Sequence, residues 1–256
     1  LRRTEELECQ VAERTAEIAK LESQRAQTEK LAAMGRLAAG VAHEINNPIA
    51  GIKNAFTLVR QAIDPAHPSA EFAGLIDREI ARVASIIQNM YQLCRPETRS
   101  GEMVDVRILV TDLEALLTPL LQQRRLKFVV DLMSALQWLC VPRGDLMQIL
   151  LNLLTNAVEC SPEGGTITLS LREEADGVRL VVRDQGGGIA PEYLPHIFDP
   201  FYTTKTGRDQ KGMGLGLSVS QSLVQAMGGT IEVDTQVHCG STFTMCLPRD
   251  RVGAKV

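Results

Sequence analysis

Apolar residues in the first 63 positions recur at spacings of three and four, which predicts one long helix ending near Ile63. Leu7, Val11 and Ile18 follow a heptad with charged residues between them, and the phase of the pattern shifts further along. Because a helical pattern longer than about 25 residues without caps is typical of a coiled coil, we expect a coiled-coil helix over residues 1–30. The alternative is an imperfect amphipathic helix that packs on its own domain.

A second helical pattern follows a short turn. Residues 64–69 hold two prolines, and residues 70–93 then place apolar side chains on one broad stripe. Two long helices joined by a short loop form a helical hairpin, which we expect over residues 31–97. A hairpin by itself leaves much of its apolar stripe exposed, so we expect two copies to pair into a four-helix bundle, that is, a homodimer.

The pattern changes after a polar, broken segment at 95–102, where we expect a domain boundary. From 102 to 250 short strands and helices alternate, which predicts a mixed sheet covered on one face by helices. The predicted fold class is therefore α+β: a coiled coil and helical hairpin followed by an α/β sandwich. We expect strands near 103–106, 125–132, 137–141, 165–173, 178–184, 230–235 and 241–247, and helices near 107–123, 143–160 and 214–227.

The composition excludes several classes of protein. The 256 residues are 45% apolar and 23% charged, which excludes a disordered chain. A net charge of −4 argues against a nucleic-acid partner, because phosphate contacts need a basic excess. The six cysteines lack metal-finger spacing, and we expect them to be reduced.

Targeting and anchoring segments are not evident in the sequence. No apolar run reaches the roughly 18 residues of a membrane span, and we find no signal peptide. The first residue is Leu1 rather than a methionine. We therefore expect a cytoplasmic fragment of a longer protein, either free or as the cytoplasmic part of a membrane-bound one.

The first chemical cluster, HEINNP, lies at residues 43–48. His43 and Asn47 are one helical turn apart and share a face, and Glu44 is adjacent to His43. A neutral imidazole with one nitrogen held by a carboxylate presents its other nitrogen as a nucleophile near neutral pH. The zinc signature His-Glu-x-x-His fails, because Asn47 stands where the second histidine would be. The alternative is a surface histidine on a solvated helix face.

Three amides, Gln148, Asn152 and Asn156, line one face of the helix expected over 143–160, most of whose remaining surface is apolar. Amide oxygens suit a hard cation such as Mg²⁺, which prefers oxygen ligands and keeps several waters. The alternative is a capping or core hydrogen-bond ladder, because buried amides need partners.

Two glycine clusters follow the amide helix. The first begins with Asp184 at a strand end and continues through Gly186 and Gly188. An acid at this place can accept a hydrogen bond from an exocyclic amine while the backbone comes close to a ring; the alternative is a polar turn. The second cluster, at 211–218, opens a helix, whose N-terminal N–H groups suit phosphates. It follows no strand and lacks a Gly-Lys-Ser/Thr ending, which argues against a Rossmann fingerprint and a P-loop.

Residues 190–211 form a segment between the two clusters that is too long for a simple connector. It carries Phe198, Phe201 and Tyr202 together with Lys205 and other cations. Long loops of this composition are candidates for lids, and the cations would neutralise phosphate charge. The alternative is a solvated basic loop.

In this order, the segments resemble the sensor histidine kinases of two-component systems. Residues 43–48 resemble the phosphoacceptor box in its H-E-x-N-N-P, NtrB-like variant. The asparagine helix, the two glycine clusters and the aromatic segment between them resemble the N, G1, G2 and F boxes of the catalytic domain, whose wider relatives are the GHKL ATPases. The resemblance spans nearly the whole chain, to about Pro248.

The resemblance implies a role for each motif, with ATP and Mg²⁺ as cofactors. His43 would be the phosphoacceptor, Glu44 its acid/base partner, and Asn47 the residue that orients water in a phosphatase reaction. Asp184 would bind adenine. Asn156 would hold Mg²⁺, and Asn152, one turn earlier on the same helix, would support it. The implied nucleotide-binding residues are Asn152, Asn156, Asp184, Gly186, Gly188, Ile189, Lys205, Gly212, Gly214, Gly216 and Leu217.

The resemblance also implies how the chain is divided and which partners it has. Residues 1–30 would be a signalling helix, 31–97 the dimerisation and phosphotransfer hairpin, and 102–250 the catalytic ATP-binding domain. The partners would be a second copy of the chain, an upstream sensor domain missing from it, and a response regulator that accepts the phosphoryl group on an aspartate. The H-E-x-N-N-P variant is common among kinases paired with NtrC-type regulators.

Two other functions stay open. Hydrolytic GHKL ATPases place a glutamate where this chain has Asn152, and asparagine cannot act as a base at neutral pH, which favours phosphoryl transfer. A non-hydrolysing ATP-binding scaffold would regulate through dimer geometry, and the intact glycine boxes count against it.

Overall fold

The computed structural model describes residues 48–64, 67, 69–93, 101–132, 137–205 and 214–248. The chain divides into two compact units, Leu1–Pro96 and Glu97–Val256. The coiled coil expected over 1–30 lies outside the described residues. Among the residues that are described, no helix is both long and apolar enough to cross a membrane.

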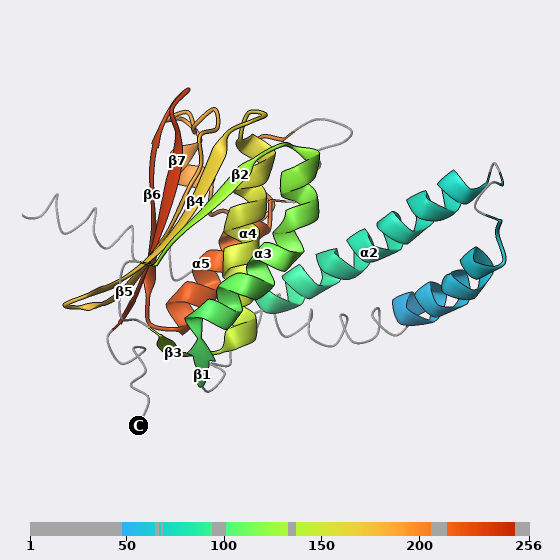
Figure 1. Cartoon of the computed structure of the whole chain (residues 1–256), viewed down its shortest axis with the longest axis horizontal. Helices are drawn as coiled ribbons and strands as arrows, with labels where there is room; N and C mark the ends of the chain where they lie inside the picture. The colour runs from blue at the N-terminus through green and yellow to red at the C-terminus, as the bar shows by residue number, and fades with distance from the viewer. Residues whose placement is uncertain are drawn as a thin grey trace, which may run out of the picture. The chain divides into compact units, whose positions relative to one another are not determined.

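The first unit contains a helical hairpin. Residues 48–61 are helical, and α2 runs from Ala70–Leu93 (Figure 1). Arg60 on the first helix forms an ion pair with Asp77 on α2, which ties the two helices together. The hairpin helices are thus confirmed over their described parts, with the first ending two residues before the predicted Ile63. Several large apolar side chains stay exposed on the single hairpin: Ile52, Leu58, Val59, Phe72, Leu75 and Ile76.

The second unit is built on a five-stranded mixed sheet. The strands are β2 (Lys127–Leu132), β4 (Thr166–Glu174), β5 (Gly177–Arg183), β6 (Thr230–Gln236) and β7 (Gly240–Pro248). Their spatial order is β2-β4-β5-β7-β6. Only the β2–β4 pair of this sheet is parallel, and the other neighbours are antiparallel. Strand β7 therefore lies between β5 and β6, although it comes last in the chain.

Three helices cover one face of this sheet: α3 (Val106–Gln123), α4 (Arg143–Cys160) and α5 (Gly216–Ala226) (Figure 1). The predicted α+β sandwich is confirmed. Two short strands, β1 (Glu102–Asp105) and β3 (Trp138–Val141), pair into a separate two-stranded sheet. Val106, predicted to end a strand, instead begins α3, because the Asp105 carboxylate accepts the N–H of Arg107 at 2.8 Å and caps the helix.

The core lies between the sheet and these helices. Strand residues at alternate positions face the helices and are buried, as the period of two requires: Ile167, Leu169 and Leu171 on β4, and Val178, Leu180 and Val182 on β5. Helix α4 contributes a buried face of Leu146, Ile149, Leu150, Leu153, Leu154, Ala157 and Val158. This burial fixes how α4 is rotated about its axis, and hence where its polar face points.

Two leucines on α3 provide a test of this core. Leu113 is fully buried, whereas Leu116 is 56% exposed. We expect Leu113→Ala to lower the free energy of unfolding by about 2–5 kcal/mol, because the truncation leaves a cavity in the core. The matched Leu116→Ala should change it by less than about 0.5 kcal/mol. Urea unfolding measures both values, and equal losses for the two variants would contradict this assignment of the core.

Candidate functional site

A buried carboxylate stands at the end of β5. Asp184 follows the last strand residue and is only 5% exposed. Its Oδ1 accepts the N–H of Gly186 at 2.7 Å and that of Ser241 at 3.2 Å. Burial raises the pKa of Asp184 above its ordinary value, and the two N–H donors offset part of that rise. Within the described residues both hydrogen bonds end at Oδ1, so Oδ2 is left for another donor.

The loop after Asp184 packs against the turn between β6 and β7. Gly188 has a φ of +69°, and an added Cβ would lie 2.1 Å from the carbonyl oxygen of Gln236, so no other residue fits there. The next residue, Ile189, donates its N–H to Thr235 Oγ1 at 3.0 Å. Gly187 O accepts a hydrogen bond from the backbone N–H of the turn residue His238 at 2.7 Å. The first glycine cluster is therefore more than a polar turn, since it interlocks with a distant hairpin.

Two hydroxyls in this hairpin belong to the site, and sequence reasoning missed both. Thr235 Oγ1 lies 2.9 Å from Ser241 Oγ, and the backbone N–H of Ser241 reaches Asp184. In the sequence, the Gly-Ser-Thr segment that begins at Gly240 indicates only a tight turn. The signal that identifies them is the pairing of β5 with β7, which brings Thr242 opposite Arg183, next to the carboxylate.

The amides of α4 differ in what they contact. Asn152 Oδ1 accepts from Gln148 Nε2 at 2.9 Å, and its Nδ2 donates to Gly216 O at 3.1 Å and to Ser220 Oγ at 3.3 Å. These bonds tie α4 to the first turn of α5. At Gln148 and Asn152 the amides thus form the hydrogen-bond ladder that the sequence left as an alternative.

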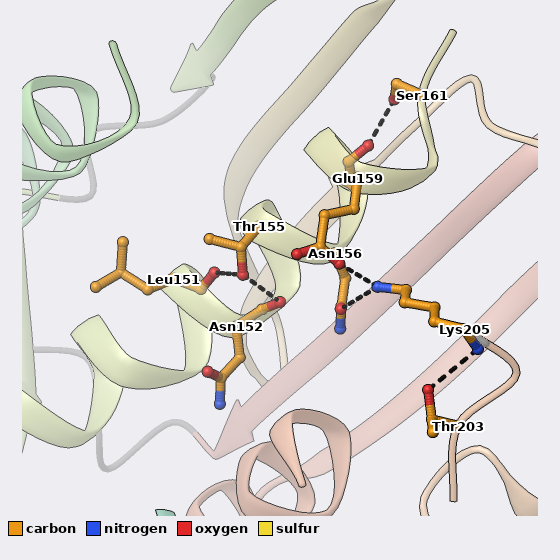
Figure 2. A network of polar contacts seen from close by, with 9 residues as sticks. Leu151, Asn152, Thr155, Asn156, Glu159, Ser161, Thr203 and Lys205 are labelled. Carbon is orange, nitrogen blue, oxygen red and sulfur yellow. Dashed lines mark hydrogen bonds and ion pairs between the residues drawn. The ribbon is translucent and has the colours of Figure 1, made fainter. Parts of the chain in front are cut away.

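Asn156, one turn further along α4, faces a different partner. Its Oδ1 accepts from Lys205 Nζ at 3.2 Å, and the same ammonium forms an ion pair with Glu159 (Figure 2). The backbone N–H of Lys205 donates to Thr203 Oγ1 at 3.2 Å, and this hydrogen bond stabilises the backbone conformation of residues 203–205. The structure therefore places a cation on the oxygen that the sequence assigns to a metal.

The second glycine cluster forms the start of α5. Gly214 has a φ of +66°, and an added Cβ would lie 2.2 Å from Tyr202 O, so the backbones of the two segments touch. Gly214 O also accepts the N–H of Phe201 at 2.9 Å. Gly216 and Leu217 are the first residues of α5, whose N-cap residue provides no side-chain hydrogen bond. The first N–H groups of a helix have no partner within the helix, so this helix start suits an anion.

Helix α4 joins these parts. Asn152 binds the start of α5, Asn156 binds Lys205, and the carbonyl oxygen of Cys160 lies 2.7 Å from where a Cβ of Gly186 would stand. The expected residues Asn152, Asn156, Asp184, Gly186, Gly188, Ile189, Lys205, Gly214, Gly216 and Leu217 thus line one region of the second unit. Four others, His43, Glu44, Asn47 and Gly212, lie outside the described residues.

The polar groups of this region fit a nucleotide with a magnesium ion. A carboxylate with one open oxygen suits an exocyclic amine, and the start of α5 suits phosphate. In the described part of the chain no group of three His, Cys, Asp or Glu side chains could hold a metal alone. Mg²⁺ is usually bound by few protein oxygens together with substrate phosphates and water. The ammonium on Asn156 Oδ1 shows that this oxygen accepts a positive charge.

Two family models match the chain. The His Kinase A (phospho-acceptor) domain matches residues 33–99, and the histidine kinase-, DNA gyrase B- and HSP90-like ATPase matches residues 142–251. Together they cover more than half of the 256 residues. The first match spans the predicted phosphoacceptor box, and the second spans both glycine clusters.

Relatives and solved structures agree with these matches. The sensor histidine kinase ZraS of Escherichia coli K12 is 33% identical over 228 residues, which cover 89% of this chain and 48% of ZraS. Full-length ShkA, solved in complex with AMPPNP, is 25% identical with a TM-score of 0.74, over 86% of this chain and 47% of ShkA. Histidine kinase ThkA, solved in complex with the response regulator TrrA, is 25% identical with a TM-score of 0.60, over 91% of this chain and 67% of that one.

The chain thus spans about half the length of a curated relative such as ZraS. Within that span it holds a phosphoacceptor helical hairpin followed by an ATPase-type sandwich, in the same order as the two matched models. The chain therefore belongs to the sensor histidine kinases of two-component systems, of which it comprises the kinase core.

Proposed function

We propose that the second unit binds ATP, with the adenine amine on Asp184 and the phosphates at the start of α5. The observation that carries this proposal is the position of α4, which contacts the Asp184 loop, Lys205 and the first turn of α5. A buried carboxylate acceptor selects an amine-bearing purine over one with a carbonyl at that position. Gly186, Gly188 and Ile189 would let the base approach, and Gly212, Gly214, Gly216 and Leu217 would surround the phosphates.

Asn156 would hold Mg²⁺ through Oδ1, and Lys205 would neutralise phosphate charge. The ion, when bound, neutralises the phosphate oxygens and orients them for transfer. Asn152 would support the metal residue from one turn away, because its amide fixes α4 against α5. A glutamate at position 152 would offer a base for water, and the asparagine that is present favours transfer of the phosphoryl group to a side chain over hydrolysis.

The acceptor in this proposal is His43. Its imidazole nitrogen attacks the γ-phosphorus, the bond from that phosphorus to the bridging oxygen breaks, and ADP leaves. Glu44 accepts the proton from the other ring nitrogen, which keeps the attacking nitrogen nucleophilic. The phosphoryl group then passes to an aspartate of a response regulator. Asn47, one turn after His43, would orient water against the phosphorylated regulator in a phosphatase reaction.

The proposed assembly is a homodimer working with a receiver domain in the cytoplasm. Pairing of two hairpins would cover the exposed side chains of Leu58, Phe72 and Leu75. ThkA was solved with a response regulator, which supports a regulator partner here, and the phosphoacceptor variant suggests the NtrC type. We further propose residues 1–30 as the signalling helix of an upstream sensor, 31–97 as the dimerisation and phosphotransfer domain, and 102–250 as the catalytic domain.

Substitution of His43 tests the proposed phosphoacceptor. His43→Ala should abolish labelling of the chain by γ-labelled ATP, because His43 is the side chain that we propose as the acceptor of the phosphoryl group. The affinity for ADP should stay within about twofold, since the nucleotide site lies in the other unit. The label on the unsubstituted chain should be acid-labile and base-stable, as phosphohistidine is. His67→Ala, in the exposed hairpin turn, is the control; persistent label in the His43 variant would overturn the assignment.

Substitution of Asp184 tests the proposed contact with the adenine amine. Asparagine at this position still accepts the two N–H bonds but stays neutral, so the purine amine loses a charged acceptor. We expect Asp184→Asn to weaken ATP and ADP binding by about 10- to 100-fold, as measured by titration calorimetry. Asp176→Asn, in the turn between β4 and β5, makes the same change of charge and should leave the affinity unchanged.

The same variant should be more stable than the unsubstituted chain at neutral pH. Because burial raises the pKa of Asp184 in the folded state, its contribution to stability is full below the ordinary aspartate pKa. That contribution is lost as the pH rises through the raised pKa, and Asp184→Asn escapes this loss. Thermal unfolding at several pH values should therefore show a gain near neutral pH that disappears on acidification. A variant that is less stable at neutral pH would contradict the proposed cost of the buried charge.

A further inference from the structure

A three-residue network connects α4 with the segment before α5. The Lys205 ammonium touches Asn156 Oδ1 at 3.2 Å and forms an ion pair with the Glu159 carboxylate (Figure 2). The two α4 residues are three positions apart, so they lie on one face of the helix about one turn from each other. The lysine side chain is 22% exposed and that of Glu159 is 45% exposed, so the ammonium is the more enclosed partner.

This network sets two cations in competition for one oxygen. In the proposed function Asn156 Oδ1 is the protein ligand of Mg²⁺. An ammonium at hydrogen-bond distance from that oxygen competes with a metal for it, because the two positive charges would repel each other. Binding of a metal-bound nucleotide there would therefore favour movement of the Lys205 ammonium off Asn156.

The Glu159 carboxylate opposes movement of the Lys205 ammonium away from Asn156. It is the charged partner of Lys205 in the described structure, whereas the contact with Asn156 is a hydrogen bond to a neutral amide. A contact between two opposite charges is stronger than one between a charge and a neutral amide, because both partners carry full charge. Without the carboxylate, the ammonium would be held near Asn156 by the amide alone.

We propose that Glu159 is a positioning residue that holds Lys205 on the metal-binding oxygen, so that loading of Mg²⁺–nucleotide is an exchange of one cation for another. Lys205 is displaced from Asn156 by the incoming metal and becomes available to the phosphates. The carboxylate thereby lowers the apparent affinity for Mg²⁺–nucleotide and keeps the ammonium close to where the phosphates arrive. This inference rests on the proposed nucleotide function of the same site.

The test measures ADP affinity by titration calorimetry on the full chain, in Mg²⁺. Glu159→Gln should tighten ADP binding by about two- to fivefold, the size expected for loss of a partly exposed ion pair. In a Lys205→Met background the same substitution should have no effect, because no ammonium is left to release. Glu163→Gln is the matched control: it removes a carboxylate just after α4 whose partner is Arg125, and the affinity should not change.

The double substitution separates the exchange from general electrostatics. Removal of any negative charge near phosphates tightens binding, but that effect would persist in the Lys205→Met background. An equal gain in both backgrounds, or no gain from Glu159→Gln alone, would overturn the exchange. Failure of the unsubstituted chain to bind ADP would overturn the proposed function itself, which distinguishes the two failures.

A second readout needs no nucleotide. An amine held against two oxygens is shielded from acylating reagents, so the acetylation rate of Lys205, followed by mass spectrometry, should rise several-fold in Glu159→Gln. Lys127, on β2, serves as the internal reference and should react at the same rate in both proteins. An unchanged rate at Lys205 would show that Glu159 does not hold the ammonium, and the proposal would fail.

Discussion

The packing of α4 is the constraint on which the site depends. Its leucine-rich face is buried against the sheet and the neighbouring helices, so the helix cannot rotate without exposing several large side chains. That fixed rotation leaves Asn152, Asn156 and Glu159 on the side where α5 and Lys205 lie (Figure 2). Packing of the apolar residues of α4 therefore fixes the direction in which its polar residues point. A site built on a helix packed in this way is rigid before a ligand binds.

A second constraint comes from the last strand of the chain. Strand β7 inserts between β5 and β6 and brings the backbone N–H of Ser241 to the Asp184 carboxylate. Burial of this group works against folding, as its raised pKa shows, and the protein retains it where a charged acceptor has a use. The buried acid that opposes stability thus lies in the region assigned to the nucleotide.

The same region contains a pair of opposite charges, Lys205 and Glu159, next to the Asn156 amide. Asn156 Oδ1 and the Glu159 carboxylate together bind the Lys205 ammonium. The site that we assign to Mg²⁺ and phosphate therefore binds a cation of the chain itself. The network also links two segments 46 residues apart, the end of α4 and the chain before α5. Lys205 thus contacts both Asn156, the proposed ligand of Mg²⁺, and Glu159, the proposed positioning residue.

Sequence patterns by themselves determined the elements, the motif order and the family. The helix predicted over 143–160 is α4, Arg143–Cys160, because an 18-residue helix with a continuous apolar face is specified by local periodicity. Asp184, Gly186 and Gly188 form a local motif, an acid at a strand end followed by glycines, which can be identified because the residues are neighbours in the chain. Only the tertiary structure decided which residues meet across it. Thr235, Ser241 and Glu159 carry no local signal, because their roles depend on strand register, hairpin packing and the direction of a helix face, which arise only when distant segments pack together.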